Sequence, residues 1–436
     1  MVLLVGVLLQ TITAFPFEMN PNQLYYPEFV TDSIRAMQKI KRILISYHAL
    51  LILALLVKGS VGYSQKALTI IETSKFGPQL NYAKGALISQ KCQQIGEVDY
   101  PNDSQLLSFV GDLKSLYLRQ ETEIDSTLFE AINKTNLPFK GLGRLDSILD
   151  KSSVVIINEA HDRLIQRVFI HELLPLLKKK GFTHLAMETL ASPSPKLDAS
   201  TGFYTSEPIM GEVFRRAVEL GFKLICYEST DEQGMNRDSI QAVNLKHQLF
   251  ENGELPKTLI VCGYGHLYEW SSSPENKMMG EYFHELTGAD PLTIDQVLLG
   301  EYSDSKYTGS MYEAMVGKEA TFLYKEDVSH FIPPFADIYL VHPRTKFVHN
   351  RPEYIRLSDD KKWVEMEGKE NTILVQAYLA SEIRNKKDFN KRIPTDQTTY
   401  FEKGNCFLAL RPNVQYVIVF RDETNRIIYK KSINVN

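Results

Sequence analysis

The chain has 436 residues, of which 44% are hydrophobic and 11% aromatic, with 49 basic and 53 acidic side chains. A chain of this length and composition can bury a sizeable core and has room for two or three domains. The net charge of -4 gives no overall attraction to nucleic acid or to anionic lipid, so nucleic acid is not an expected partner. Four scattered cysteines favour neither a disulfide framework nor a zinc ribbon.

Residues 1–64 have the features of a leader. Three basic residues closely follow Met37, and a largely apolar run ending at Val57 comes next, before small residues such as Gly59 and Gly62. This order is typical of a secretory signal peptide, with Met37 as a candidate start. The alternative is an uncleaved membrane anchor, for which the run is short. We therefore expect a secreted or periplasmic protein that meets a membrane only through this segment.

Residues 65–150 form the next predicted unit, a helical segment that packs on the core. Its clearest feature is an amphipathic stretch from Ser104 to Ile132, with apolar residues at helical spacing. We expect this stretch to cover the sheet that follows.

Residues 151–368 are predicted to form an α/β domain in which short apolar runs alternate with amphipathic helices. The first four runs are Val154 to Ile157, His184 to Met187, Lys223 to Tyr227, and Thr258 to Cys262. The helices between them are Asp162 to Lys180, Glu207 to Leu220, and Arg237 to Phe250, each followed by a glycine at 181, 221 or 253. Runs that are apolar on both faces and separated by single helices indicate a mainly parallel sheet with right-handed crossovers.

Residues 369–436 differ from the preceding domain because alternation of apolar and polar residues returns. The runs are Thr372 to Tyr378, Cys406 to Leu410, Gln415 to Phe420, and Arg426 to Ile433, separated by turn-forming residues. This pattern predicts a small antiparallel β module at the C-terminal end. The predicted fold class is therefore α/β, with a mainly parallel sheet flanked by helices and a β-rich C-terminal module.

Ionisable residues follow each of the four strands. The first ends in Asn158-Glu159-Ala160-His161, the second in Glu188, the third in Glu228, and the fourth in Gly263-Tyr264-Gly265-His266. If the strands are parallel, these endings share the carboxyl edge, where open α/β folds bind ligands. A single glutamate there is often a helix-capping residue, and a single histidine is often merely solvated. Four consecutive endings of this kind favour a functional site.

Two chemistries fit this set of residues. Glu159 and His161 can position a water, with one acting as general base and the other orienting it. Alternatively, His161, Glu188 and His266 are candidate ligands of a divalent metal that would activate the water.

Other nearby residues are candidates for substrate binding. Gly263 and Gly265 around Tyr264 either offer backbone amides to an oxyanion or simply form a tight loop. Arg237 is either an anion clamp in the site or part of a surface pair at a helix start. Serine-triad and dinucleotide chemistry are disfavoured, because the sequence has neither a Gly-x-Ser-x-Gly elbow nor a glycine-rich phosphate loop of the required form.

The order and spacing of these motifs resemble the erythromycin esterase / ChaN / TIKI superfamily over roughly residues 145–350. The matching elements are Asn158-Glu159-Ala160-His161, Ala186-Met187-Glu188, Arg237-Asp238 and Gly263-Tyr264-Gly265-His266. Members include macrolide-lactone esterases, haem-binding lipoproteins and metal-dependent peptidases.

The resemblance implies roles for individual residues. It makes His161 the water-activating base, Glu159 and Glu188 its partners, and His266 a second site imidazole. Asn158 stands where the family usually has glycine, which either alters the approach of the backbone or supplies a side-chain amide.

We therefore predict a hydrolase-like enzyme that uses Glu159, His161, Glu188 and His266 to activate water against an ester, lactone or amide. Glu228, Arg237, Tyr264, Gly263 and Gly265 are the predicted substrate-binding residues. The expected partner is a small-molecule or peptide substrate. The alternatives are a haem- or metal-binding protein of the same fold without turnover, with Tyr264 as a candidate haem ligand, and an inactive scaffold.

Overall fold

The chain divides into two compact units, Met1–Lys58 and Gly59–Asn436, and every described residue belongs to the second. The computed structural model describes residues 127, 130–132, 142–161, 163–191, 197–198, 201–202, 205, 207–229, 236–250, 253–271, 277–301, 306–349, 351–358, 360–372, 374–399, 405–422 and 426–436. The predicted leader and most of the predicted amphipathic stretch 104–132 lie outside these residues. No helix within the described ranges is long and apolar enough to cross a membrane.

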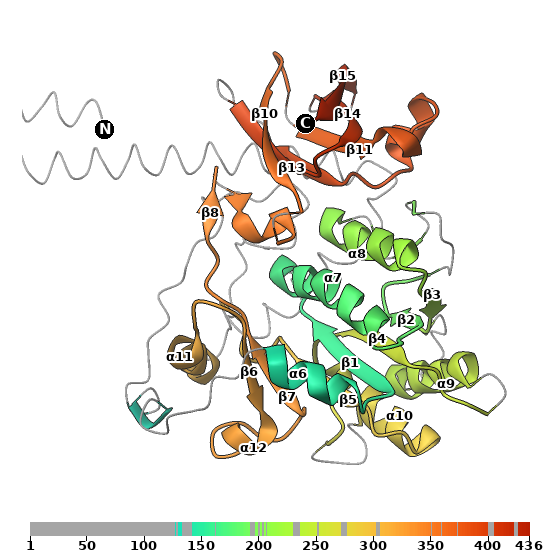
Figure 1. Ribbon diagram of the computed structural model, residues 1–436, viewed down its shortest axis with the longest axis vertical. Coiled ribbons are helices and arrows are strands. Elements are labelled where there is room, and N and C mark those ends of the chain that lie inside the picture. Colours follow the sequence, from blue (N-terminus) through green and yellow to red (C-terminus); the bar gives the residue numbers. More distant parts are fainter. Residues whose placement is uncertain are drawn as a thin grey trace, which may run out of the picture. The chain divides into compact units, whose positions relative to one another are not determined.

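A seven-stranded sheet forms the centre of the α/β domain, in the order β3-β2-β4-β1-β5-β7-β6 (Figure 1). Its strands are β1 (Val154–Glu159), β2 (His184–Met187), β3 (Lys223–Cys226), β4 (Thr258–Gly263), β5 (Leu292–Asp295), β6 (Thr321–Tyr324) and β7 (Ile338–Val341). All neighbouring pairs are parallel except β6 with β7. The predicted mainly parallel sheet is therefore confirmed.

Helices cover both faces of this sheet. They are α6 (Leu142–Leu149), α7 (Leu164–Lys179), α8 (Pro208–Glu219), α9 (Arg237–Leu249), α10 (Met279–Thr287), α11 (Lys306–Met315) and the short α12 (Lys325–Val328). On β1, Val155 and Ile157 pack against α6, α7 and α8, whereas Val154 and Ile156 pack against α9, α10 and α11. In Figure 1, α7 and α8 accordingly lie on the opposite side of the sheet from α9 and α10. Burial on both faces explains why the strands are apolar at most positions.

Glycines with positive φ follow the crossover helices, as the sequence predicted. Gly181, Gly221 and Gly253 have φ values of 84°, 71° and 84°. Only glycine adopts this left-handed conformation without a steric cost, so Gly181 and Gly221, directly after the C-caps of α7 and α8, end these helices. Gly253 lies three residues beyond the C-cap of α9.

The order of the strands brings the four predicted endings together. β4 lies between β1 and β2, and β3 is the outer neighbour of β2. The strands β1, β4, β2 and β3 are thus contiguous, and their carboxyl ends share one edge of the sheet. Cys226 and Cys262 are separated by β2, and both are free thiols.

The C-terminal β module contains a two-stranded sheet of β10 and β13 and a four-stranded sheet in the order β12-β11-β14-β15. Its strands are β10 (Lys362–Glu367), β11 (Leu374–Leu379), β12 (Asp396–Thr399), β13 (Asn405–Leu410), β14 (Val414–Arg421) and β15 (Ile427–Val435). A short hairpin of β8 (Phe347–Val348) and β9 (Arg351–Pro352) and the 3₁₀ helix η4 (Glu353–Arg356) precede it. All of these pairings are antiparallel, which confirms the predicted module. β10 pairs with β13 and so belongs to the module, although it precedes residue 369, the predicted start of the module.

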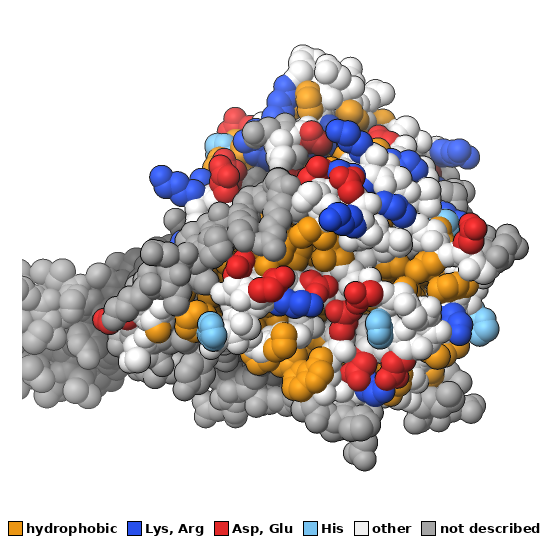
Figure 2. Space-filling view, turned by 60° about the horizontal axis from the view of Figure 1, so that its bottom comes forward, with side chains coloured by type: hydrophobic (Ala, Val, Ile, Leu, Met, Phe, Trp, Pro, Cys, Tyr) orange, Lys and Arg blue, Asp and Glu red, His pale blue; other side chains and the backbone are white. Residues whose placement is uncertain are grey.

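Apolar residues of the β module pack on the α/β domain. Leu164 and Val168 of α7 share a buried cluster with Ile355, Leu357 and Ala409. On the face displayed in Figure 2, acidic and basic side chains of the described residues are intermixed, in keeping with the small net charge.

Candidate active site

Glu159 ends β1 and is 3% exposed. Its carboxylate accepts from Nε of Arg167 at 2.7 Å and from Nη2 at 3.2 Å. Arg167 is fully buried on α7, and its Nη1 also donates to Glu207 Oε2 at 3.1 Å. Burial opposes ionisation of Glu159, but the charge of Arg167 and the hydrogen bond with His161 outweigh it and lower the pKa of Glu159 to about 2. Glu159 is therefore ionised at neutral pH.

His161 is held by this ionised carboxylate. Its Nδ1 lies 2.9 Å from Glu159 Oε1. Because a carboxylate can only accept, Nδ1 carries the hydrogen, and Nε2 is the acceptor nitrogen of the neutral ring. The ring also packs edge to face on Tyr264, with centroids 4.8 Å apart. Glu159 thus sets both the orientation and the tautomer of the imidazole.

The absence of a side chain at Gly263 makes room for the imidazole of His161. A Cβ added at Gly263 would lie 2.8 Å from Cε1 and 3.1 Å from Nε2 of His161, and 3.2 Å from Glu188 Oε2. Any other residue would displace the ring or the carboxylate. His161 and Glu188 therefore meet at the end of β4.

Asn158, which replaces the glycine usual in the resembling family, supplies a side-chain amide. Its Nδ2 donates to the carbonyl of Tyr264 at 2.6 Å, and its Oδ1 accepts from the backbone N–H of Gln296 at 2.8 Å. Tyr264 has a φ of 46°, a left-handed conformation that is uncommon outside glycine. The Asn158 hydrogen bond stabilises this turn beside His161.

Arg237 joins the endings of β2 and β3. Its Nη2 donates to Glu188 Oε1 at 2.6 Å and also to Glu228 Oε2, while its Nε donates to Glu228 Oε1 at 2.9 Å. The backbone N–H of Gly263 donates to Glu188 Oε2 at 2.5 Å. Burial raises the pKa of Glu188, but the charges of His266 and Arg237 outweigh burial and lower it. Arg237 therefore enters the site and is not a surface pair.

His266 lies in the 3₁₀ helix η2 (Tyr264–Leu267), next to Arg237. Its Nδ1 is 2.6 Å from Asp238 Oδ1, and its Nε2 is 3.1 Å from Arg237 Nη1. Since a guanidinium can only donate, Nε2 accepts and Nδ1 donates to Asp238 in this geometry. Burial lowers the pKa of His266, but the hydrogen bond that it donates to Asp238 and the charge of Glu188 outweigh burial, so its pKa is raised.

The structure brings most of the predicted site residues to one edge of the sheet. Those in mutual contact are Glu159, His161, Glu188, Glu228, Arg237, Gly263, Tyr264 and His266. Gly265 instead packs against the ring of Tyr268, so its role is in the turn.

The sequence pattern gave Asp238 no role beyond the Arg237-Asp238 element, and it did not point to the supporting residues Glu207, Gln241 and Gln296. Gln241 Nε2 donates to Glu228 Oε1 at 3.1 Å. Asp238 could have been found from its place beside Arg237 in the first turn of α9.

The residues at this edge do not fit a metal ion. The guanidinium of Arg237 lies between Glu188 and Glu228 and against His266, where a metal would have to sit, and Arg167 neutralises Glu159. His266 has both ring nitrogens hydrogen-bonded, so it is not available as an axial haem ligand either. In the part of the chain that is described, no group of three or more His, Cys, Asp or Glu residues is arranged to hold a metal.

Comparison with known proteins yields only remote similarity. No family model matches the chain, and no curated protein matches it. Two solved structures, described as "Bacterial protein toxins" and "Crystal structure of bacterial protein toxins", match with TM-scores of 0.27 and 0.29 and identities of 17% and 18%. The matches cover 40% and 44% of this chain and 42% and 44% of those chains. Scores of this size establish neither a shared fold nor a shared function. The class that the observed geometry defines is an α/β protein with an arginine-linked Glu/His cluster.

Proposed function

We propose that the protein is a hydrolase-like enzyme, secreted or periplasmic, that activates water against an ester, a lactone or an amide. The observation that carries the proposal is the pair Glu159 and His161, in which an ionised, buried carboxylate holds Nδ1 of an imidazole at 2.9 Å. An imidazole whose Nδ1 is held by a carboxylate presents Nε2 in a fixed direction, which is the arrangement required of a general base.

His161 would remove a proton from water through Nε2 as the water oxygen attacks the carbonyl carbon of the substrate. The proton moves to the ring, and Glu159 stabilises the resulting imidazolium. When the tetrahedral intermediate collapses, the same proton passes to the leaving alcohol or amine. The products are a carboxylic acid and the leaving group, so atoms and charge balance.

Arg237, whose guanidinium is hydrogen-bonded to Nε2 of His266, would stabilise the negative oxygen of the intermediate. The Arg237 side chain is 38% exposed, whereas Arg167 is fully buried. Arg237 can therefore reach a bound substrate from the solvent side, while Arg167 is confined to its buried contacts with Glu159 and Glu207. A preorganised cation near the developing charge supplies the electrostatic part of such a reaction.

Ester, lactone and amide hydrolysis is also what the resemblance to the erythromycin esterase / ChaN / TIKI superfamily implies for these motifs. The substrate would be a small molecule or a peptide. The haem- or metal-binding and scaffold alternatives both predict no hydrolysis, so the same experiment separates them from the proposal.

The test is hydrolysis of a panel of aryl esters, lactones and peptide amides by wild type, His161→Ala and His247→Ala. His247 is an exposed histidine on α9 and serves as the matched control. We expect kcat/KM to fall about 10²- to 10⁴-fold in His161→Ala and to stay unchanged in His247→Ala. Equal hydrolysis by His161→Ala and wild type, or no hydrolysis by wild type across the panel, would contradict the proposal.

A further inference from the structure

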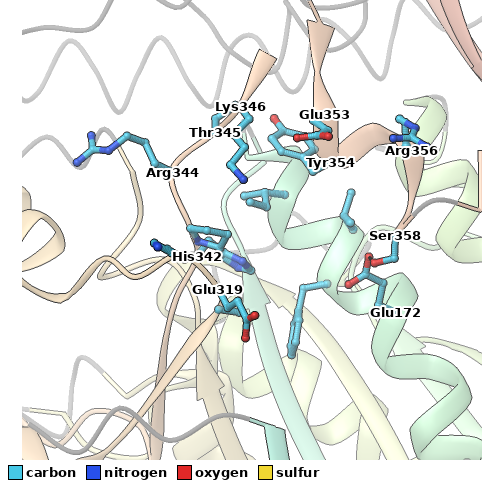
Figure 3. A pocket seen from close by; sticks show the side chains of 16 residues that line it. Glu172, Glu319, His342, Arg344, Thr345, Lys346, Glu353, Tyr354, Arg356 and Ser358 are labelled. Carbon is cyan, nitrogen blue, oxygen red and sulfur yellow. Dashed lines mark hydrogen bonds between the residues drawn. The ribbon is translucent and has the colours of Figure 1, made fainter. Parts of the chain in front are cut away.

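A second cavity, of about 480 Å³, lies where β7 ends, between α7 and the segment around η4. Its apolar wall includes Ile165, Val168 and Phe169 of α7, and the last two are buried. Figure 3 shows His342 and Glu319 on one side of the cavity and Glu172 of α7 on the other. The size suits a small organic ligand, because such sites typically measure about 300 to 1,000 Å³. Neither Glu159 nor His161 lines it.

His342 is the polar group in the apolar part of this cavity. It directly follows β7, is 4% exposed, and its ring packs edge to face on Phe169 with centroids 5.9 Å apart. Its Nε2 lies 2.8 Å from Gln296 Oε1. The Gln296 amide nitrogen donates to Asn158 O at 2.7 Å, so the Gln296 oxygen must accept and Nε2 of His342 carries the hydrogen.

The second ring nitrogen of His342 is therefore a fixed acceptor. Among the described residues Nδ1 has no hydrogen-bond partner, and the ring lines the cavity. Burial lowers the pKa of His342 to about 3, so the ring stays neutral at physiological pH. An acceptor on the ring that lines a cavity can receive a hydrogen bond from a ligand that supplies a donor.

The charges around the cavity argue for a ligand without net charge. The lining includes the basic residues Lys318, Arg344, Lys346 and Arg356 and the acidic residues Glu172, Glu319 and Glu353, so neither sign strongly prevails. The neutral ring of His342 and the apolar side chains of Val168 and Phe169 offer no counter-ion to a charged group placed against them. We propose that this cavity is a binding site for a neutral, largely apolar molecule whose hydroxyl group donates a hydrogen bond to Nδ1 of His342.

The site is independent of hydrolysis, so its test is binding alone. Equilibrium dialysis compares 2-naphthol with naphthalene, which has the same shape but no hydroxyl. For wild type we expect 2-naphthol to bind about two- to tenfold more tightly, the contribution of one hydrogen bond. In His342→Phe, the aromatic ring can keep the packing on Phe169 but offers no hydrogen-bond acceptor, so the preference for 2-naphthol should vanish.

Two further variants locate the binding. Ile165→Trp fills the cavity and should abolish binding of both compounds. Ser152→Trp places the same bulk in a different cavity, near the start of β1, and should leave binding unchanged. The proposal is overturned if 2-naphthol does not bind wild type, if both compounds bind equally, if the preference persists in His342→Phe, or if binding survives Ile165→Trp.

Discussion

Among the described residues, two buried networks of glutamate and arginine can be compared, and one of them is a candidate active site. The first joins Glu159 with Arg167 and Glu188 with Arg237 at the carboxyl edge of the sheet. The second surrounds Glu212 of α8 at its junction with the β module. There Arg215 Nη1, Arg411 Nη2 and Lys361 Nζ lie 2.9, 3.0 and 3.6 Å from the carboxylate of Glu212. Both networks lower the pKa of a buried glutamate to about 2.

The difference lies in the imidazole that each network contains. His171, beside Glu212, is 3% exposed, and within the described residues neither of its ring nitrogens has a hydrogen-bond partner. Burial lowers its pKa to about 4, so His171 is a neutral side chain that contributes to the core by packing. His161 is instead held through Nδ1 by Glu159. Burial and charge pairing therefore do not distinguish a site from a domain junction, whereas an oriented imidazole does.

The largest expected effect is a loss of stability without a loss of activity. Glu212→Leu leaves Lys361, which is 1% exposed, without its carboxylate and should destabilise the protein by about 3–5 kcal/mol. Glu219→Ala removes an exposed i,i+3 partner of Arg216 on the same helix and should cost at most about 1 kcal/mol. Urea titration measures both. Hydrolysis per folded molecule should be unchanged in each, and a selective loss of activity in Glu212→Leu would erase the distinction between the networks.

Gly263→Ala should lower activity much more than stability, in contrast to Glu212→Leu. The new methyl group would lie 2.8 Å from Cε1 of His161, so the ring must move away from its position above β4. A displacement of this kind costs up to about 100-fold in rate, while the loss of stability should be smaller than in Glu212→Leu. The measurement is kcat/KM beside the urea midpoint. A variant with wild-type kcat/KM would show that the close approach of His161 to Gly263 is unimportant.

The smallest effect is a pH dependence of stability caused by His171. Its pKa falls from 6.5 to about 4 on folding, so below pH 6.5 the unfolded state binds the extra proton and stability declines until about pH 4. Replacing His171 with Leu removes this loss, which amounts to about 2 kcal/mol between neutral pH and pH 5. Urea titrations at the two pH values test it, with His247→Leu as an exposed control. Parallel pH profiles of wild type and His171→Leu would show that His171 does not titrate as described.

The fold was largely predictable because its information is local. Apolar runs, helical spacing and the glycines at 181, 221 and 253 placed β1 to β4 and α7 to α9 within a few residues. The order of the strands was not predictable in the same way, since the insertion of β4 between β1 and β2 depends on pairing between distant segments. β12 was missed because its buried residues are polar: Asp396 is satisfied by Arg351, at 2.6 and 2.8 Å, which no local pattern reveals.

The candidate site was also predictable only where its information is local. Its strand-end residues follow apolar runs, so the sequence identified Glu159, Glu188, Glu228 and His266 together. The contacts that set their charge come from other elements: Glu207 lies 40 positions from Arg167, and Gln296 lies 138 positions from Asn158. Which imidazole is oriented and which is merely buried follows from such contacts. His161 and His171 could not be told apart by hydrogen bonding until the fold was known.

The most direct test of the central claim is a double-mutant cycle on Glu159 and His161. We predict that Glu159→Gln and His161→Ala each lower kcat/KM strongly, and that the double variant is no slower than His161→Ala, because the two residues act as one unit. All values are normalised to folded protein by circular dichroism. Losses that multiply in the double variant would mean that the carboxylate and the imidazole act independently, and would contradict the account.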